Sequence, residues 1–353
     1  MSSRYLMGHI CEINALACTP DGATLASASE DHTVRLWRLS DGSCTAVLEG
    51  HTRWVVALAC TPDGATLASA SWDHTVRLWR LADNTCTAVL EGHTIFVDAL
   101  ACTPDGATLA SGSWDNTVRL WRLADNTCNA VLKGHTNEVR ALACTPDGAI
   151  LASGSNDNTV RLWRLADNTC TAVLKGHTSV VVALACTPDG ATLASTSNDK
   201  TVRLWRLSDG TCTAVLEGHT SPVYSLAFTP DGATLASGDK GGTVRLWRLT
   251  DNTCTAVLEG HTDDVNALAF TPNGKTLSVS RYNDVLLVDT VLTEEEECFI
   301  CYNSTHLQPI CVNMHRVCLE CITLLRGESR CPYCRQNMLV GDVSFRIIEG
   351  ISK

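Results

Sequence analysis

The sequence predicts an all-β protein in which a seven-bladed β-propeller is followed by a small zinc-stabilised domain. One unit of 42 residues recurs from Gly8 to about Val291, marked by seven Gly-His pairs, and each unit holds four short apolar stretches. After the repeats, eight cysteine and histidine residues follow in four close pairs. A period in the forties with four strands per unit is typical of propeller blades. Paired cysteines and histidines are typical of structural zinc sites.

Each repeat unit is expected to form four strands. In the second unit these are VVALAC at 55–60, TLASAS at 66–71, TVRLW at 75–79 and CTAVL at 86–90. A Pro-Asp-Gly sequence makes the turn between the first two strands. A helical solenoid would need longer segments with a 3.6-residue period, and the units have neither.

The ends of the repeat region explain how the ring closes. The seventh unit stops after its third strand, near Asp289, and residues 1–7 stand where a fourth strand would precede the first Gly-His pair. We therefore expect the N-terminal strand to complete blade seven, which removes exposed sheet edges. The predicted propeller spans residues 1–291.

The unit resembles the WD repeat, although the dipeptide that names the family is Trp-Arg here, as at Trp37 and Trp79. The resemblance implies a buried, hydrogen-bonded set of His, Ser, Asp and Trp in each blade. In the second unit this set would be His51, either Ser69 or Ser71, Asp73 and Trp79. We interpret these residues as structural rather than catalytic, because a buried carboxylate needs such partners.

The first five units keep this set, and the last two depart from it. The sixth has Gly241 where the Asp should stand, with Asp239 two positions earlier. The seventh has Asn283 for the Asp and Asp289 for the Trp, so the outer part of blade seven is expected to be looser.

Twelve of the 19 cysteines lie in the repeats. One repeat position is occupied by Cys18, Cys60, Cys102, Cys144 and Cys186, and then by Phe228 and Phe270. Exchange with phenylalanine predicts a buried apolar side chain rather than a disulfide. A second set, from Cys44 to Cys254, recurs in the fourth strand without a partner at bonding range.

The net charge and the free cysteines limit the cellular compartments and the classes of partner that we expect. With no signal peptide and no apolar run long enough to span a bilayer, we expect no membrane association and a reducing compartment, cytoplasm or nucleus. A net charge of −11 and a pI near 5.4 argue against a general nucleic-acid binder.

The segment after the repeats carries eight candidate zinc ligands, which are Cys298, Cys301, Cys311, His315, Cys318, Cys321, Cys331 and Cys334. Zinc takes four thiolate or imidazole ligands, so eight predict two structural Zn²⁺ ions. A segment this short does not fold on a hydrophobic core alone. Three residues separate Cys311 from His315, and two separate the members of every other pair.

The order of ligand types resembles the RING finger, in which the first and third pairs share one zinc. The resemblance implies one site of Cys298, Cys301, Cys318 and Cys321 and a second site of Cys311, His315, Cys331 and Cys334. His306 falls outside the pair spacing and is expected at the surface, with replacement of His315 as the alternative. Residues 298–335 form the predicted RING domain, after an acidic linker at 292–297 and before a tail at 336–353.

RING domains mostly act as ubiquitin ligases, and the resemblance implies a groove for a ubiquitin-conjugating enzyme. Its apolar wall would be Ile300, Leu325, Pro332 and Tyr333, and Arg335 would contact both ubiquitin and the conjugating enzyme. The propeller would then bind the substrate protein. The alternative is a non-catalytic scaffold whose RING is a docking or dimerisation module, and the role of the tail stays open.

Differences among the repeats predict where the propeller binds its partner. They concentrate at the start of the first strand and at the residue before the turn Asp, places that face the top of WD-repeat propellers. Three of the nine tryptophans stand there, and the predicted docking patch comprises Trp54, Val56, Trp72, Phe96 and Trp114, with a polar edge of Asp98, Glu138 and Arg140. Tyr224 and Tyr282 lie further round the ring. The alternative is that these tryptophans pack against neighbouring loops.

The order of the strands also predicts where the RING is attached. The third strand of a blade should end on the bottom face, so the RING would follow the propeller on the side opposite the docking patch. A mobile segment of the substrate would then have to reach around the propeller, whose strands of five residues are only about 17 Å long.

Overall fold

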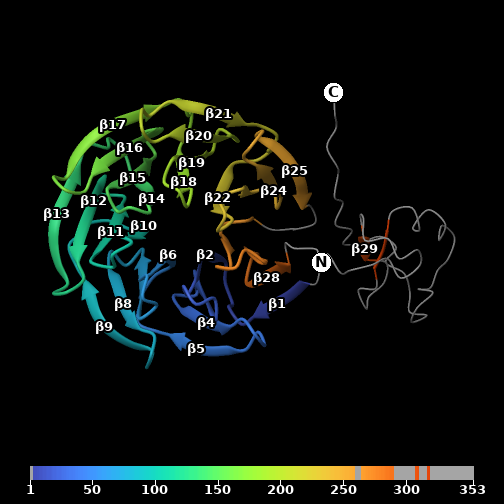
Figure 1. Cartoon of the computed structure of the whole chain (residues 1–353). Coiled ribbons are helices and arrows are strands. Elements are labelled where there is room, and N and C mark those ends of the chain that lie inside the picture. Colours follow the sequence, from blue (N-terminus) through green and yellow to red (C-terminus); the bar gives the residue numbers. More distant parts are fainter. Residues whose placement is uncertain (1–2, 259–263, 290–306, 310–315, 319–353) are drawn as a thin grey trace.

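A computed structural model describes residues 3–258, 264–289, 307–309 and 316–318 of the chain. Seven antiparallel sheets of four strands each follow one another around a central axis (Figure 1). The all-β, seven-bladed propeller predicted from the repeats is therefore confirmed. Within the described ranges, no helix has the length and apolar character needed to cross a membrane.

The first three blades are consecutive quartets of strands. Blade one contains β2 (Ile13–Cys18), β3 (Thr24–Ser29), β4 (Val34–Arg38) and β5 (Cys44–Leu48). Blade two contains β6 (Val55–Cys60), β7 (Thr66–Ser71), β8 (Val76–Arg80) and β9 (Thr85–Leu90). Blade three contains β10 (Val97–Cys102), β11 (Thr108–Ser113), β12 (Thr117–Arg122) and β13 (Thr127–Lys133).

The next three blades repeat this pattern. Blade four contains β14 (Val139–Cys144), β15 (Ile150–Ser155), β16 (Thr159–Arg164) and β17 (Thr169–Lys175). Blade five contains β18 (Val181–Cys186), β19 (Thr192–Ser197), β20 (Val202–Arg206) and β21 (Cys212–Leu216). Blade six contains β22 (Val223–Phe228), β23 (Thr234–Asp239), β24 (Val244–Arg248) and β25 (Thr253–Leu258).

Blade seven joins the two ends of the repeat region. It consists of β26 (Leu268–Phe270), β27 (Thr276–Ser280), β28 (Asp284–Asp289) and the N-terminal strand β1 (Ser3–Met7). β1 pairs antiparallel with β28 as the outermost strand, as Figure 1 shows. Leu6 of β1 is buried against Ile13 and Trp37 of blade one. The N-terminal strand therefore completes blade seven and connects it to blade one.

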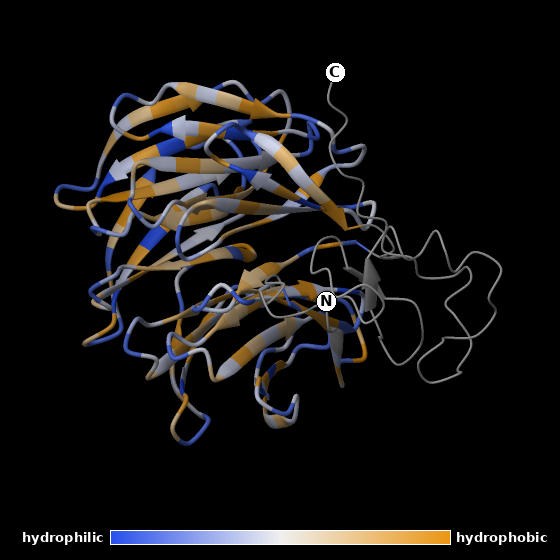
Figure 2. Cartoon of the chain, turned by 45° about the vertical axis from the view of Figure 1, so that its right-hand side comes forward, coloured by the Kyte–Doolittle hydropathy of each residue, from blue (hydrophilic) through white to orange (hydrophobic). Residues whose placement is uncertain are grey.

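The strands alternate in direction between two faces of the ring. We call the face with the Gly-His turns the top face; each first strand starts there and runs to the Pro-Asp-Gly turns at the bottom face. β28 ends at Asp289, opposite Thr276 and close to the turn at Asn273. The described propeller therefore ends on its bottom face. Figure 2 shows hydrophobic and hydrophilic residues intermixed along the strands.

The hydrophobic core lies between neighbouring blades. The Trp79 side chain of β8 is 2% exposed and packs in one cluster with Val34, Leu36 and Leu48 of blade one. The second strand of each blade is almost wholly buried, as the pattern of β7 illustrates. Because every blade buries its apolar face against the next, no blade can form this core by itself.

The hydrogen-bonded set predicted in each blade, which we call the framework network, is present in blades one to six. In blade two the Trp79 indole N–H donates to Ser69 Oγ, 2.8 Å away, and Ser69 Oγ lies 2.8 Å from His51 Nε2. His51 Nδ1 donates to Asp73 Oδ2 over 2.8 Å. The structure thus selects Ser69 for the network, whereas Ser71 Oγ donates to the Arg53 carbonyl.

Asp73 shows how the network stabilises a carboxylate away from water. Burial raises the pKa of Asp73, but hydrogen bonds from His51 and Thr75 outweigh burial and hold that pKa below its ordinary range. The same balance holds for the corresponding residues Asp31, Asp115, Asp157 and Asp199. The interpretation of these residues as structural agrees with this geometry.

Blades six and seven depart from the network in different ways. In blade six Asp239 accepts the bond from His219 Nδ1, 2.7 Å away, and its other oxygen accepts from the Gly241 and Thr243 amides. Blade six therefore retains a carboxylate in the network, supplied by a residue two positions earlier in the repeat. In blade seven Val279 stands at the Ser position and is fully buried among apolar side chains. The histidine of this unit, His261, lies outside the described residues.

The 12 cysteines of the propeller are all free thiols, as predicted. The inner set is half-buried rather than fully buried, because its side chains lie at the margin of the clusters between blades. Burial raises the pKa of the Cys60 thiol to about 11, and the nearby Asp63 adds to the shift. The prediction of burial was therefore too strong, although Cys102 and Phe228 do pack against equivalent clusters.

Beyond the propeller, the described residues form one antiparallel pair, β29 (Leu307–Pro309) and β30 (Arg316–Cys318), in which Leu307 lies opposite Cys318. The other predicted ligands, the predicted groove residues, the linker and the tail lie outside the described residues. Those predictions stay predictions. Among the residues that the structure does describe, no three His, Cys, Asp or Glu side chains converge to hold a metal ion.

Candidate functional site

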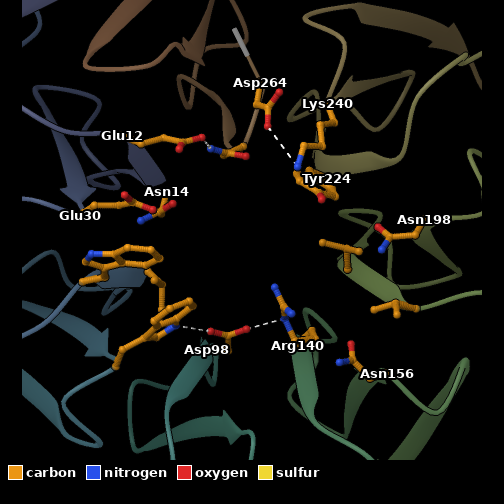
Figure 3. A pocket seen from close by; sticks show the side chains of 16 residues that line it. Glu12, Asn14, Glu30, Asp98, Arg140, Asn156, Asn198, Tyr224, Lys240 and Asp264 are labelled. Atoms are coloured by element: carbon orange, nitrogen blue, oxygen red, sulfur yellow. Dashed lines mark hydrogen bonds and ion pairs between the residues drawn. The ribbon is translucent and has the colours of Figure 1, made fainter.

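A cavity of about 500 Å³, which we call the axial cavity, opens at the centre of the top face (Figure 3). All seven blades contribute to its lining, and every lining residue stands at one of three repeat positions. The first position, three residues after the His, supplies Glu12, Trp54, Val180 and Asp264. The second, five residues after the His, supplies Asn14, Val56, Asp98, Arg140, Val182, Tyr224 and Asn266. The third, before the turn Asp, supplies Glu30, Trp72, Asn156, Asn198 and Lys240.

A β-bulge places the second position at the cavity. In blade two Val55 pairs with Ser71 and Ala57 pairs with Ala70, so Val56 has no partner on the next strand. The same shift occurs in blades one and three to six. A bulge of one residue redirects its side chain. The extra residue therefore reaches the axial cavity instead of joining the regular alternation of the sheet.

A backbone hydrogen bond fixes the first and third positions beside each other. The Trp72 amide donates to the Trp54 carbonyl over 3.0 Å, and the Glu30 amide donates to the Glu12 carbonyl over 2.9 Å. Equivalent bonds occur in blades three to six. The backbone that presents the cavity residues is thus uniform, and the side chains are what differ from blade to blade.

The aromatic residues of the predicted patch form one cluster. The rings of Trp54 and Trp72 have centroids 4.4 Å apart, and Phe96 stacks on Trp72 with a centroid distance of 4.8 Å and an interplanar angle of 10°. Trp114 meets Phe96 edge-on at 5.1 Å. Trp54 is 37% exposed, whereas Trp72, Phe96 and Trp114 are half-buried. The patch is therefore less exposed than predicted, because these rings cover one another.

Asp98 lies inside this cluster and not at its polar edge, which corrects the prediction. The Trp72 indole N–H donates to Asp98 Oδ1 over 2.9 Å, and the Arg140 Nε–H donates to Asp98 Oδ2. The Asp98 side chain is only 6% exposed. Asp98 takes this central place because the half-buried indole N–H and the guanidinium both need an acceptor.

Five of the eight predicted patch residues line the axial cavity, namely Trp54, Val56, Trp72, Asp98 and Arg140. The other three pack behind them. Phe96 and Trp114 support Trp72, and Glu138 Oε2 accepts a 2.9 Å bond from the Asn156 side chain. The predicted residues are thus brought together, but around a central cavity and not on one outer sector of the rim.

The predicted patch contained no cavity residue of blades one, five, six or seven, although Tyr224 of blade six was noted, and it omitted Asn156 of blade four. Glu12, Asn14 and Glu30 of blade one stand at the same three positions as Trp54, Val56 and Trp72. Sequence variation among the repeats does mark these positions, so this pattern could have identified the residues. The predicted patch centred on the tryptophans of blades two and three, whereas a cavity on the axis receives residues from every blade.

The charges around the cavity are unevenly paired. Asp98 pairs with Arg140, and Lys240 Nζ lies 3.8 Å from Asp264 Oδ2 and 5.7 Å from the centre of the Tyr224 ring. Glu12 Oε1 accepts a 2.6 Å bond from the Asn266 side chain, and among the residues that the structure describes neither Glu12 nor Glu30 forms an ion pair. Burial raises the pKa of Glu30, and the nearby Glu12 carboxylate raises it further.

An open cavity with an aromatic cluster and a few fixed polar groups is suited to binding a polypeptide segment. The framework histidines lie beneath this surface and are buried, as the 7% exposure of His51 illustrates. The candidate functional site is therefore a docking surface made by the variable positions of the repeat.

Comparison with known proteins agrees with this architecture. Seven segments match the family described as WD domain, G-beta repeat, at residues 2–38, 42–80, 84–122, 126–164, 168–206, 210–248 and 252–288. One stretch of 41 residues is 46% identical to Protein HIRA of Zea mays, and one of 42 residues is 48% identical to Protein HIRA of Oryza sativa subsp. japonica. Each covers 12% of this chain and 4% of the relative.

A third similarity, to WD repeat-containing protein 86 of Homo sapiens, is 46% over 46 residues and covers 13% of this chain and 12% of that protein. The chain thus spans a small part of the length of these relatives. The family match, in contrast, extends over all seven blades, including the N-terminal strand. The chain therefore belongs to the WD-repeat family.

Proposed function

We propose that this protein is a RING-type ubiquitin-protein ligase in which the propeller binds the substrate protein. The single observation that carries the proposal is the order and spacing of the eight ligands between Cys298 and Cys334, together with the groove residues at their expected offsets. The RING would recruit a ubiquitin-charged conjugating enzyme. A substrate lysine amine would then displace the enzyme's thiol from the ubiquitin thioester, forming an amide without any covalent intermediate on this chain.

The set of donors fits structural zinc. Seven cysteines and one histidine offer two closed sets of four, and neither set leaves a position for water. Bound zinc would supply the metal–ligand bonds that fold a segment with too few apolar residues for its own core. The pairing of β29 with β30 supports a compact fold for this segment. It brings the backbone of Leu307 opposite that of Cys318, and Cys311 and His315 lie between these two residues in the sequence.

The propeller supplies features suited to substrate capture. WD-repeat propellers generally bind partner proteins, and the axial cavity gathers the residues in which the blades differ. The described propeller ends on its bottom face, at Asp289. A RING that follows it would be attached opposite the axial cavity, so ubiquitin transfer would favour a mobile segment of the substrate over a rigid surface.

Self-ubiquitination of the purified full chain with a panel of conjugating enzymes tests the ligase proposal. We expect ubiquitin chains with the wild type and their loss in Ile300→Ala and Arg335→Ala, with two zinc ions retained per molecule. Arg248→Ala is the matched control, because this arginine is exposed on blade six and lies outside the RING. A folded protein that holds two zinc ions but forms no product with any enzyme would favour the non-catalytic scaffold.

A further inference from the structure

Blade one carries two carboxylates at the axial cavity, Glu12 and Glu30, that form no ion pair with any residue the structure describes. Four acidic side chains line the cavity, and the two on other blades, Asp98 and Asp264, have basic partners. Among the described residues, the Glu12 side chain accepts a hydrogen bond from the Asn266 amide, and neither Glu12 nor Glu30 has a cationic partner. One sector of the cavity is therefore negative.

The two carboxylates are held close together by the fold. The backbone bond from the Glu30 amide to the Glu12 carbonyl fixes their relative position, and both residues are half-buried. Figure 3 shows Glu12, Asn14 and Glu30 on one side of the cavity. Two like charges in a partly buried site repel each other, which destabilises the empty site. A cation placed between them would relieve this repulsion.

An indole surface adjoins this acidic sector. The Asn14 side chain of blade one donates to the Val55 carbonyl of blade two over 3.4 Å, directly next to Trp54. Trp54 is exposed at the cavity and is held from behind by Trp72, which Asp98 and Phe96 fix in turn. An aromatic face suits the aliphatic stem of a lysine or arginine, and it also attracts the cationic head group.

We propose that the sector formed by Glu12, Glu30 and Trp54 binds a lysine or arginine side chain from an extended segment of the partner protein. The cationic head group lies between the two carboxylates, and the stem lies on the Trp54 indole. The volume of about 500 Å³ accommodates one long side chain together with neighbouring backbone. This inference rests on the proposed binding of a substrate by the propeller, and it names the chemistry of the recognised segment.

Fluorescence anisotropy with labelled heptapeptide mixtures tests the inference on the full, zinc-loaded chain. Each mixture fixes the central residue as Lys, Arg, norleucine or Glu, and the flanking positions are mixtures of Ala, Ser and Gly. We expect Lys- or Arg-centred mixtures to bind about tenfold more tightly than the norleucine mixture, because norleucine has the four-carbon stem of lysine without the charge. Binding should weaken as the salt concentration rises, because the carboxylates remain partly exposed.

Two isosteric variants of blade one locate the effect. Glu30→Gln should reduce binding of the cationic mixtures about fivefold to tenfold and leave norleucine binding unchanged. Glu49→Gln is the matched control, because Glu49 is an exposed carboxylate of the same blade that lies outside the axial cavity. Equal binding of Lys and norleucine mixtures, tighter binding of the Glu mixture, or an unaffected Glu30→Gln variant would each overturn the inference.

This experiment separates the two proposals, because peptide binding requires no conjugating enzyme. Cation-selective binding by a chain that forms no ubiquitin product would support the recognition of a basic segment and count against the ligase. Ubiquitin transfer by a chain that binds the peptide mixtures without this selectivity would support the ligase and count against the recognition of a basic segment.

Discussion

Glu30 and Asp31 are neighbours in the chain, yet their carboxylates have opposite electrostatic surroundings. The framework residue Asp31 accepts hydrogen bonds from His9 and Thr33, which outweigh burial and lower its pKa. At Glu30, burial and the charge of Glu12 both raise the pKa. One carboxylate therefore stabilises the fold, whereas its neighbour is held in an unfavourable state, which is common at binding sites.

This difference extends to the whole propeller. The framework network has the same distances in blade after blade, for example 2.8 Å from the Trp indole nitrogen to Ser Oγ in blades one, three and five. The three cavity positions carry acidic, basic, amide, aliphatic and aromatic side chains on the same backbone. Stability and recognition are thus assigned to separate positions of one repeat, so the cavity can change without loss of the fold.

Lowering the pH should weaken the framework network in blades one to six at the same time. The pKa values of Asp31, Asp73, Asp115, Asp157, Asp199 and Asp239 lie below the ordinary 3.8 in the folded protein. Their stabilisation is present above pH 3.8 and is lost progressively as the pH falls below it.

Urea unfolding followed by tryptophan fluorescence measures this effect in the propeller alone, because all nine tryptophans lie in the repeats. The midpoint should stay level near neutral pH and fall steeply below about pH 4. A midpoint that does not change down to pH 3 would contradict the stabilising role of these carboxylates.

The neighbouring pair in blade one offers the sharpest single-residue test. Asp31→Asn should lower the free energy of unfolding by about 2 kcal/mol, because the amide oxygen can accept from either Thr33 or His9, and the amide NH2 then faces the other donor. Glu30→Gln should change it by less than about 0.5 kcal/mol, since no donor among the described residues bonds to its carboxylate. Urea titration of both variants checks this difference, and equal losses would remove the distinction between framework and cavity.

The thiols of the first-strand cysteines should react more slowly with an alkylating reagent than those of the fourth-strand cysteines. Cys60 is half-buried and its pKa is raised to about 11, so little thiolate is present at pH 8. Cys86 is exposed on the outer strand of the same blade. Site-resolved mass spectrometry after iodoacetamide treatment should show Cys86 modified about tenfold faster or more. Similar rates would indicate that the inner thiols are more open than the structure describes.

Much of the architecture could be predicted because it repeats. The Gly-His spacing indicated the number of blades, and the missing fourth strand of the seventh unit indicated that residues 1–7 complete blade seven, where Leu6 pairs with Val285. The framework residues were predictable as a set, but the choice of Ser69 over Ser71 was not. Both serines alternate onto the same side of β7, and only the position of the His51 ring distinguishes them.

The candidate site could be predicted only in part. Variable positions marked Trp54 and Trp72, but no pattern indicated that Asp98 would lie between Trp72 and Arg140 from the next blade. No pattern in the sequence singled out Glu12 or Glu30 from the other variable positions. Their place at the cavity depends on closure of the ring, which brings seven segments that are distant in the sequence to one axis.

By itself, the sequence determined the all-β class, the seven blades and the positions at which they differ, because each follows from local strand patterns repeated at a fixed period. It also carries the order of the predicted zinc ligands. Only the tertiary structure decided that the differing positions share one cavity. A β-bulge in the first strand redirects the second position, and closure of the ring brings it to the axis; neither is visible in the alternation of any single strand.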